Sequence, residues 1–389
     1  MPGMVMLTHK LRMTVRTKRQ REALMRALET SRLLSNAGLE ERRGAWTKAK
    51  LSIGLHAQYQ SLTVLSGDPS LHGLPVTLLR WPLKRLELAF KGFFKRVRNG
   101  QSPGFPRFRS ASRWTSFGYS DRSGWKLVGR RLDLSRIGRF PLHLHRPLEG
   151  DVRSLAMRRE GRKWFALITV ELANANAQAG PAVGVDLGLT RLATLSSGEI
   201  IPNPREGKRR ARAIAAARRA LARAMRGSKR RSRVKDRLAA LKRREAKARS
   251  TYLHQQSAWL TRRYRTIVIE DLHIKSMMRS ATGSVDEPGR RVAQKSGLNR
   301  SIADAAWGRF VTFLAYKAER AGGQVIRVKP HHSSNCCSKC QRLTPSRIGD
   351  AFSCAHCGHM SDRDHNAALN ILARGVVTPV AQAASLPRS

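Results

Sequence analysis

Three carboxylates stand at the ends of apolar segments, where acidic side chains are unusual. Asp186 interrupts the apolar run 183–187, Glu270 ends the run 266–269, and Asp364 precedes a helix-like stretch. Because burying an unpaired charge is costly, an acid at a strand end is commonly salt-bridged, so each of these alone would be a weak indication. The three together predict a shared site.

Carboxylates gathered at one point repel one another, which raises their pKa values unless divalent cations neutralise them. Two magnesium ions about 4 Å apart could do so, and such a pair activates a water and stabilises the leaving oxygen in phosphodiester cleavage. Nuclease chemistry is therefore the predicted activity. Asp186 is the candidate to bridge both ions, with Glu270 and Asp364 each completing one coordination sphere. Asp271 and Asp362 are near neighbours that could be mistaken for the ligands.

The cysteines predict a second metal site. All five lie within residues 336–357, whereas disulfide-bonded secreted proteins normally spread their cysteines through a short chain. Two Cys-x-x-Cys pairs supply four thiolates, the number that a closed, structural, tetrahedral zinc site needs. The predicted ligands are Cys337, Cys340, Cys354 and Cys357. Cys336 is left as a spare thiol, and His356 and His359 are less favoured because four sulfurs already complete the set.

The charge balance predicts a polyanionic partner. The 389 residues contain 75 Lys plus Arg and 26 Asp plus Glu, a formal net charge of +49. Nucleic acid is favoured over an anionic membrane, because the sequence has neither an apolar run long enough to span a bilayer nor a dominant basic amphipathic helix. Residues 1–10 lack the features of a secretory signal, so we expect the protein to stay inside the cell, in the cytoplasm.

The elements that would position the acids form a mixed α/β layer from residue 181 onward. Strands are expected at 183–187, at 267–269 and at 325–328. Between the last two, apolar residues at helical spacing from Trp307 to Leu314 predict an amphipathic helix, and core packing accounts for its aromatic residues. Residues 276–299 are rich in Gly, Ser and Arg and predict a mobile loop.

Residues 205–249 contain 20 Lys or Arg and only three acids, and they predict a basic helical hairpin. A solvated face is the ordinary interpretation of a charge run. Here the acids that would pair such a face are missing, which favours contact with a duplex backbone.

The first part of the chain predicts helices followed by strands. A capping box at Thr17 and Gln20 begins helical spacing that continues to about Arg98. Turn-forming residues in 99–106 indicate a domain junction. Short apolar runs beyond it, at 132–134, 142–145 and 164–172, predict a small antiparallel β-barrel that ends near residues 177–180.

These segments resemble TnpB, the transposon-encoded nuclease related to the type V CRISPR effectors. The matching pieces are residues 89–94, 103–108, 138–150, 184–190, 267–272, 333–340, 354–358 and 362–372. The resemblance implies a RuvC-like, RNase H-like nuclease domain with an inserted zinc ribbon, a wedge β-barrel and a helical recognition module. It also implies a guide RNA from the transposon end, one protein per RNA, and cleavage of double-stranded DNA beside a short adjacent motif.

The domain boundaries implied by the resemblance run along the whole chain. They are 1–14 and 104–180 for the wedge barrel, 15–103 for the recognition module, 181–335 and 359–375 for the nuclease domain, 336–358 for the zinc ribbon and 376–389 for a tail.

Two departures and three alternatives accompany this resemblance. Gln341 stands where the family usually has Gly, and His332 stands where Tyr is common. A small type V CRISPR effector would share every motif. A guide-dependent repressor that does not cleave is disfavoured by the intact acid set, and a strand-joining transposase is disfavoured because the resemblance is to the nuclease.

Overall fold

The computed structural model describes residues 4–71, 73–145, 147–173, 176, 180–284, 287–344 and 350–376. The predicted tail beyond residue 376 and residues 345–349 of the predicted zinc ribbon lie outside the described residues. The chain divides into an N-terminal unit, residues 6–173, and a C-terminal unit, residues 174–389 with residues 1–5.

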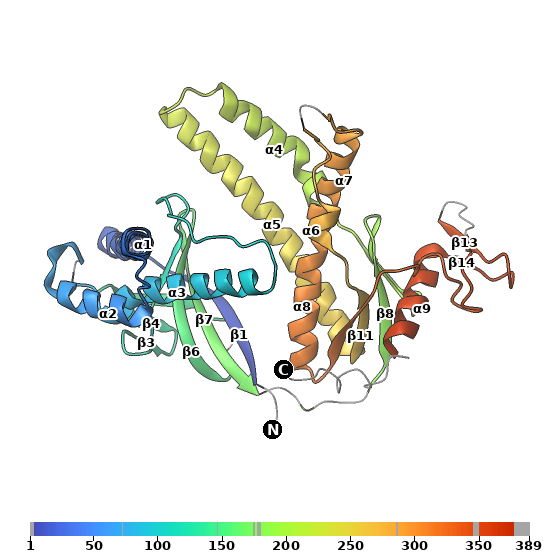
Figure 1. Ribbon diagram of the computed structural model, residues 1–389, viewed down its shortest axis with the longest axis horizontal. Coiled ribbons are helices and arrows are strands. Elements are labelled where there is room, and N and C mark those ends of the chain that lie inside the picture. Colours follow the sequence, from blue (N-terminus) through green and yellow to red (C-terminus); the bar gives the residue numbers. More distant parts are fainter. Residues whose placement is uncertain are drawn as a thin grey trace. The chain divides into compact units, whose positions relative to one another are not determined.

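A five-stranded sheet forms the centre of the C-terminal unit (Figure 1). Its order is β10 (Ile200–Pro202), β9 (Arg191–Leu195), β8 (Ala182–Leu187), β11 (Thr266–Glu270) and β12 (Gln324–Val328). The strands β8, β11 and β12 are parallel, while β8–β9 and β9–β10 are antiparallel pairs. Central parallel strands are covered on both faces, which explains why β8 and β11 are apolar apart from their acids.

Helices cover both faces of this sheet. α5 (Lys229–Arg263) and α8 (Trp307–Arg320) pack on one face, where Phe310, Leu314 and Leu260 are fully buried. α9 (Arg363–Val376) packs on the opposite face, against β8 and β11 (Figure 1). A two-stranded ribbon of β13 (Ala351–Ser353) and β14 (Met360–Asp362) precedes α9.

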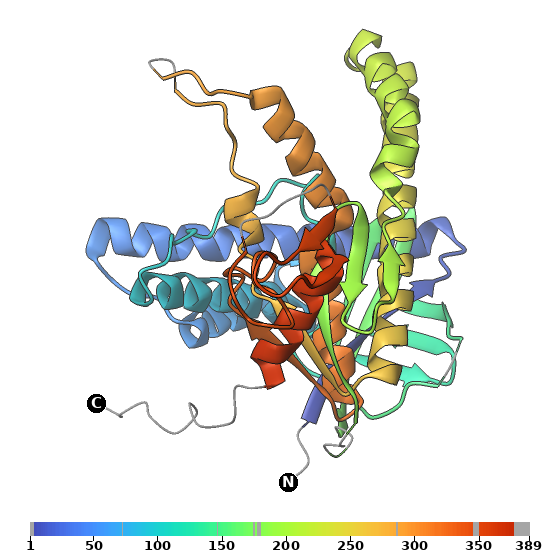
Figure 2. The ribbon, with the colours of Figure 1, turned by 90° about the vertical axis from the view of Figure 1, so that its right-hand side faces the viewer.

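The predicted basic hairpin is present as α4 (Glu206–Arg223) packed along α5, and the two helices extend together beyond the sheet (Figure 2). α6 (Ile274–Met277) and α7 (Val292–Ala305) follow β11. The loop predicted for 276–299 is therefore wrong at residues 276–277 and from residue 292 onward. Tertiary contacts fix this helix, because the Asp304 carboxylate accepts the Gly207 backbone N–H and pairs with Arg249 at 2.9 Å.

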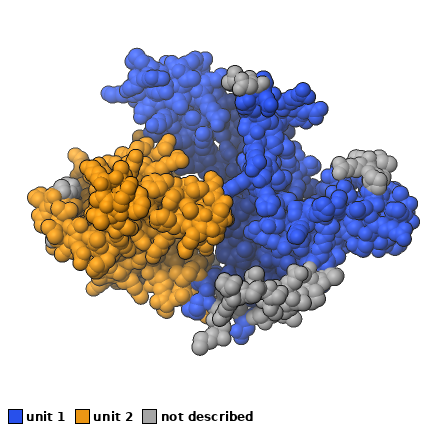
Figure 3. All heavy atoms as spheres, viewed as in Figure 1, with its two compact units in different colours: residues 1–5, 174–389 blue, residues 6–173 orange. Residues whose placement is uncertain are grey.

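The N-terminal unit, coloured orange in Figure 3, contains a seven-stranded sheet and a group of helices, which the ribbon of Figure 1 shows. Its helices are α1 (Lys18–Ala49), α2 (Leu55–Val64) and α3 (Val76–Arg98), with short 3-10 turns at Leu65–Gly67 and Pro69–Leu71. They lie in the sequence between β1 (Met4–Met13) and the remaining strands. Thr17 and Gln20 form the predicted capping box at the start of α1.

The strand order of this sheet is β2-β6-β7-β1-β5-β4-β3. The remaining bounds are β2 (Ser116–Gly118), β3 (Trp125–Val128), β4 (Arg131–Leu134), β5 (Gly138–His143), β6 (Asp151–Glu160) and β7 (Lys163–Ala173). Phe117, Phe140, Met157 and Ile168 are fully buried between sheet and helices. Closure into the predicted barrel stays a prediction, since β2 and β3 end the order and no pair between them is described.

Candidate functional site

The register of β8 and β11 brings two of the predicted acids together. Val185 pairs with Ile269, so the next residue on each parallel strand is Asp186 or Glu270. Alternate side chains point to opposite faces of a sheet, and these two therefore emerge side by side on one face. That face is the one that α9 covers.

α9 carries the third acid to the same place. A Cβ on Gly184 would overlap the backbone carbonyl of Ala368, so the helix lies directly on β8 at a position that only glycine allows. Gly375 makes a similar close approach to Val268 of β11. Asp364 lies in the first turn of α9, one turn before Ala368, where the positive end of the helix dipole favours a carboxylate.

Electrostatics shows that the three acids interact. Burial raises the pKa of Asp186 to about 7, and the charges of Glu270 and Asp364 add to this effect. Burial also raises the pKa of Asp364, with a further contribution from the charge of Asp362. Asp186 therefore lies close enough to Glu270 and Asp364 to be repelled by both charges, and a bound cation would relieve this repulsion.

The acids are less closely gathered than the ligands of a single ion. Among the described residues, the four predicted cysteines are the group whose metal-binding atoms lie together, all within 4.8 Å. Two ions about 4 Å apart, each about 2.1 Å from its oxygens, span ligand oxygens as far as about 8 Å from one another. A pair of ions could therefore be held by acids that lie further apart than the four cysteines.

The two neighbouring acids have arginine partners. Asp271 pairs with Arg327 at 3.0 Å, and Asp362 pairs with Arg191 at 2.9 Å. Asp362 also accepts the backbone N–H of Asp364, which caps the start of α9. Burial alone would raise the pKa of Asp362, but the hydrogen bonds from Arg191 and the helix backbone outweigh it and lower that pKa. Each neighbouring acid is thus paired with an arginine.

A buried polar group that the sequence did not reveal connects the acids to the cysteine segment. The Ser333 hydroxyl donates to the carboxylate of Glu270. The Asn370 side chain donates to the backbone carbonyls of Ser333 at 2.9 Å and of Cys336 at 2.6 Å, and Asn366 donates to Cys336 at 2.8 Å. Both asparagines are buried on α9. Two amide side chains four residues apart on an apolar helix were the feature of the sequence that could have indicated these buried hydrogen bonds.

Trp307 contributes more than core packing. Its buried indole N–H donates to the carbonyl of Gly188 at 3.1 Å, in the loop directly after Asp186. Asn203 donates to the next carbonyl of that loop, at Leu189, at 2.8 Å. These bonds hold the backbone that carries Asp186, and periodicity alone gave no sign of them.

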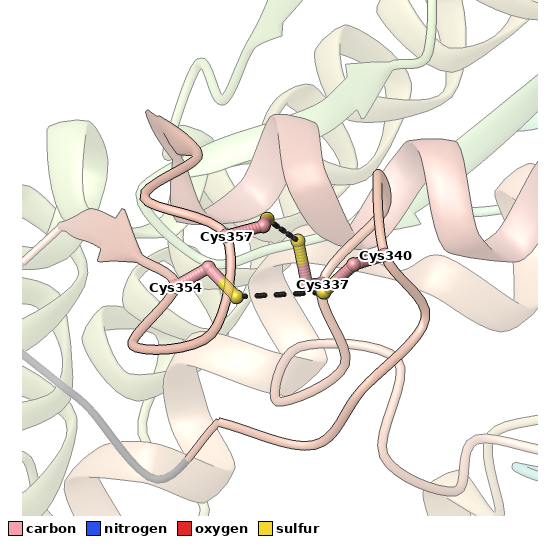
Figure 4. Close-up of side chains that lie close together, drawn as sticks. All are labelled: Cys337, Cys340, Cys354 and Cys357. Atoms are coloured by element: carbon pink, nitrogen blue, oxygen red, sulfur yellow. Dashed lines mark hydrogen bonds between the residues drawn. The ribbon is translucent and has the colours of Figure 1, made fainter.

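The four predicted zinc ligands come together (Figure 4). The sulfur atoms of Cys337 and Cys357 are 3.7 Å apart, and those of Cys340 and Cys354 are 3.6 Å apart. Tetrahedral zinc with bonds of about 2.3 Å requires sulfur–sulfur distances of about 3.8 Å. The cluster therefore fits a zinc site. The spare thiol of Cys336 is buried beside it and contacts a backbone carbonyl.

The two departures from the family pattern fall at left-handed backbone positions. Gln341 has φ of 58° and His332 has φ of 56°. Glycine adopts this conformation without steric cost, which explains why Gly is usual in the place of Gln341. Here the Gln341 side chain donates to the carbonyl of Ser338 at 2.9 Å.

The hairpin of α4 and α5 keeps its positive excess in the structure. Glu206 is buried and pairs with Arg209 and Arg210, and Glu245 pairs with Arg249. These local pairs use few of the twenty basic side chains in residues 205–249. Across the described part of the chain, we find no helix with the length and apolar character that crossing a membrane requires.

Two family models match the regions that contain these residues. The model described as "Probable transposase" matches residues 165–281, and the one described as "Cas12f1-like, TNB domain" matches residues 307–371. InsQ of Escherichia coli (strain K12), named as an RNA-guided DNA endonuclease, is 33% identical over 310 residues, which cover 77% of this chain and 75% of InsQ. The chain belongs to the TnpB family.

The similarity extends over most of this TnpB-family chain. A protein of Streptomyces pristinaespiralis, also named as an RNA-guided DNA endonuclease, is 29% identical over 373 residues, which cover 92% of this chain and 87% of the relative. The cryo-EM structure of a Cas12f1–sgRNA–target DNA complex aligns with a TM-score of 0.59 at 12% identity, over 95% of this chain and 98% of that one. The TnpB-family chain thus shares the fold of that Cas12f1 protein.

Proposed function

We propose that this protein is an RNA-guided DNA endonuclease that cleaves phosphodiester bonds at Asp186, Glu270 and Asp364. The names of its relatives support the guided activity. One observation carries the site assignment. Asp186 and Glu270 leave adjacent parallel strands on one face, beneath the helix of Asp364, and burial together with the two other charges raises the pKa of Asp186 to about 7.

The donor set suits magnesium, because carboxylate oxygens are the ligands that this ion prefers. Asp186 would contact two ions, and Glu270 and Asp364 would each hold one. Magnesium bound there would lower the pKa of the attacking water and stabilise the leaving oxygen.

The chain's own side chains fix the orientation of the three carboxylates. Ser333 donates to Glu270 and so selects which of its oxygens faces the site. Asp362 caps α9 and keeps Asp364 in the first turn. Trp307 holds the loop after Asp186 through the Gly188 carbonyl. Such contacts preorganise a site that would otherwise open under its own charge repulsion.

We further assign one structural zinc ion to the four cysteines. A closed set of four sulfurs leaves no open position for chemistry. The segment that it would hold is the one whose backbone Asn366 and Asn370 bind, so the ion would keep Ser333 in reach of Glu270.

The nucleic-acid partners follow from charge and family. A guide RNA derived from the transposon end would pair with one strand of a double-stranded DNA target, and base pairing would supply the sequence choice. The basic hairpin of α4 and α5 would bind the phosphate backbone of that duplex. One protein per RNA would suffice, because all three acids belong to one chain.

The test begins with the full chain and the RNA that copurifies with it. That RNA is sequenced, and a plasmid library that carries a matching target beside randomised sequence is incubated with magnesium. We expect cleavage by the wild type and by Asp271→Asn, whose carboxylate pairs with an arginine outside the acid set. Asp186→Asn should bind the target without cutting it.

Each other outcome contradicts a defined part of the proposal. Cleavage by Asp186→Asn would overturn the site assignment. Guided binding by the wild type without cleavage would indicate the repressor alternative. Copurified RNA that carries CRISPR repeats would favour the small type V effector over the transposon protein.

A further inference from the structure

The N-terminal unit fixes an exposed loop, residues 104–109, in one conformation. The Arg96 guanidinium donates to the carbonyl of Gly104 at 3.1 Å. At the other end, the Asn36 side chain exchanges two hydrogen bonds with the backbone of Arg109, at 2.9 and 3.0 Å. Arg32 adds a third bond to the Arg109 carbonyl at 3.1 Å. Contacts at both ends therefore hold the intervening residues in place.

This loop presents large apolar side chains to solvent. Phe105 and Phe108 are 47% and 48% exposed. The Phe105 ring packs edge-on against Phe90 and Phe93, at centroid distances of 5.6 and 5.3 Å. Exposed apolar side chains that lie together and are rimmed by polar residues mark binding surfaces.

The two rings border a cavity of about 380 Å³. It is lined by Leu39, Arg43, Phe105, Pro106, Arg107 and Phe108. This volume lies within the range of about 300–1,000 Å³ of small-ligand sites. The lining combines flat apolar surface, on which a nucleobase can stack, with two guanidinium groups, which can bind its phosphate.

The charges around the cavity favour an anion. Neither Arg43 nor Arg107 has an ion-pair partner among the described residues, whereas the neighbouring Arg42 pairs with Glu87 at 2.8 Å. Residues 99–109 contain two arginines, Arg107 and Arg109, and no Asp or Glu. A neutral apolar partner would leave these charges unpaired.

We propose that this cavity, which we call the Phe105–Phe108 pocket, binds one unpaired nucleotide of a single-stranded nucleic acid. The base stacks on the two phenylalanine rings, and Arg43 and Arg107 bind the adjoining phosphates. Stacking on aromatic side chains needs a free face of the base, which a base inside a duplex does not offer. The pocket therefore distinguishes single strands from duplexes, whereas the basic hairpin binds any phosphate backbone.

This inference deepens the proposed function by adding a single-strand contact, and it is independent of cleavage. The test uses the full chain and three probes of about 12 nucleotides or base pairs: oligo(dT), oligo(U) and a DNA duplex. Affinities are measured over a range of salt concentrations. The stacking chemistry is the same for DNA and RNA. The affinities for oligo(dT) and oligo(U) therefore have to be compared to separate a DNA partner from an RNA partner.

We expect Phe108→Leu to weaken single-strand binding about 5- to 150-fold, with duplex binding and the salt dependence unchanged. Phe108→Tyr, which keeps the ring, should bind like the wild type. Phe94→Leu is the matched control, since Phe94 is 55% exposed in the same aromatic group and does not line the pocket. Arg107→Gln should reduce the salt slope for single strands by about 0.7.

Several results would overturn the proposal. They are an equal loss for duplex and single strand, an unchanged affinity in Phe108→Leu, or an equal loss in Phe94→Leu. A change in self-association on sedimentation, without a change in single-strand affinity, would show that a second copy of the chain covers the pocket. Thermal melting of each variant tests whether a lost affinity comes from lost folding. The Phe108→Tyr variant, which keeps the aromatic ring, separates loss of the ring from loss of the fold. Guided cleavage assayed in parallel distinguishes failure of this inference from failure of the proposed nuclease.

Discussion

Replacing Asp186 by asparagine should stabilise the magnesium-free protein at high pH. The pKa of Asp186 in the folded chain is about 7, against a value of 3.8 for the free side chain. The folded state therefore retains a proton that the unfolded state releases, so stability falls as pH rises from about 4 to 7 and stays low above pH 7. Asp186→Asn removes this penalty because the amide carries no charge.

The size of the effect follows from the two pKa values. A shift from 3.8 to about 7 corresponds to a full penalty of about 4 kcal/mol above pH 7. About 1.6 kcal/mol of it is already present at pH 5, since the unfolded side chain is ionised there. The stability difference between variant and wild type should thus widen by about 3 kcal/mol between pH 5 and pH 8. Any loss of stability caused by the contacts of the new amide is the same at pH 5 and pH 8, so it cancels in this comparison.

Hydrogen exchange of the β8 and β11 amides is the suitable assay, because it reports the local stability of this sheet in a chain of two units. The ratio of the wild-type exchange rate to the Asp186→Asn exchange rate should be about 100 times larger at pH 8 than at pH 5. The buffers contain no magnesium and no chelator, since a chelator would also remove zinc. Adding magnesium at pH 8 should slow exchange in the wild type and have little effect on the variant.

An exchange ratio that is the same at both pH values would refute the reasoning. It would mean that Asp186 is already ionised at pH 5 and that Glu270 and Asp364 do not repel it. The two-ion site would then lose its electrostatic basis, whatever the cleavage assay showed.

Three further predictions concern the elements around the acids. Gly184→Ala should destabilise the docking of α9 by about 1–3 kcal/mol and reduce cleavage, because the new Cβ overlaps the Ala368 carbonyl; exchange of the α9 amides measures this. Ser333→Ala should raise the magnesium concentration needed for cleavage about 10- to 100-fold without weakening target binding, because Glu270 loses its donor. Cys354→Ser should lower the bound zinc, measured by elemental analysis, and destabilise the cysteine segment in a melting experiment.

Each of these has a matched control. Gly44→Ala should be tolerated, because a Cβ there meets no atom within 4 Å, and equal damage would contradict the steric argument. Ser334→Ala should keep the magnesium requirement of the wild type, since the Ser334 hydroxyl contacts only its neighbour Asn335 at 3.4 Å among the bonds described. Cys336→Ser should keep its zinc, and loss of zinc there would reassign the ligands.

Local features of the chain could be predicted from the sequence because neighbouring residues determine them. The apolar runs around Asp186 and Glu270 predicted strands, and the cap at Thr17 predicted the start of α1. The spacing of the cysteines was sufficient to select four that now lie within 4.8 Å of one another. Short strands such as β10 and the helix from residue 292 were not predicted, since distant contacts rather than local composition stabilise them.

The sequence by itself determined which side chains could bind metal, because residue type and spacing fix the available donor atoms. Only the tertiary structure decided that Asp186 and Glu270 share a face, through a strand register between segments far apart in the chain. It alone revealed that Ser333, Asn370 and Trp307 hold the acids in place. Strand register and helix docking depend on the packing of the whole core, and no local sequence pattern specifies that packing.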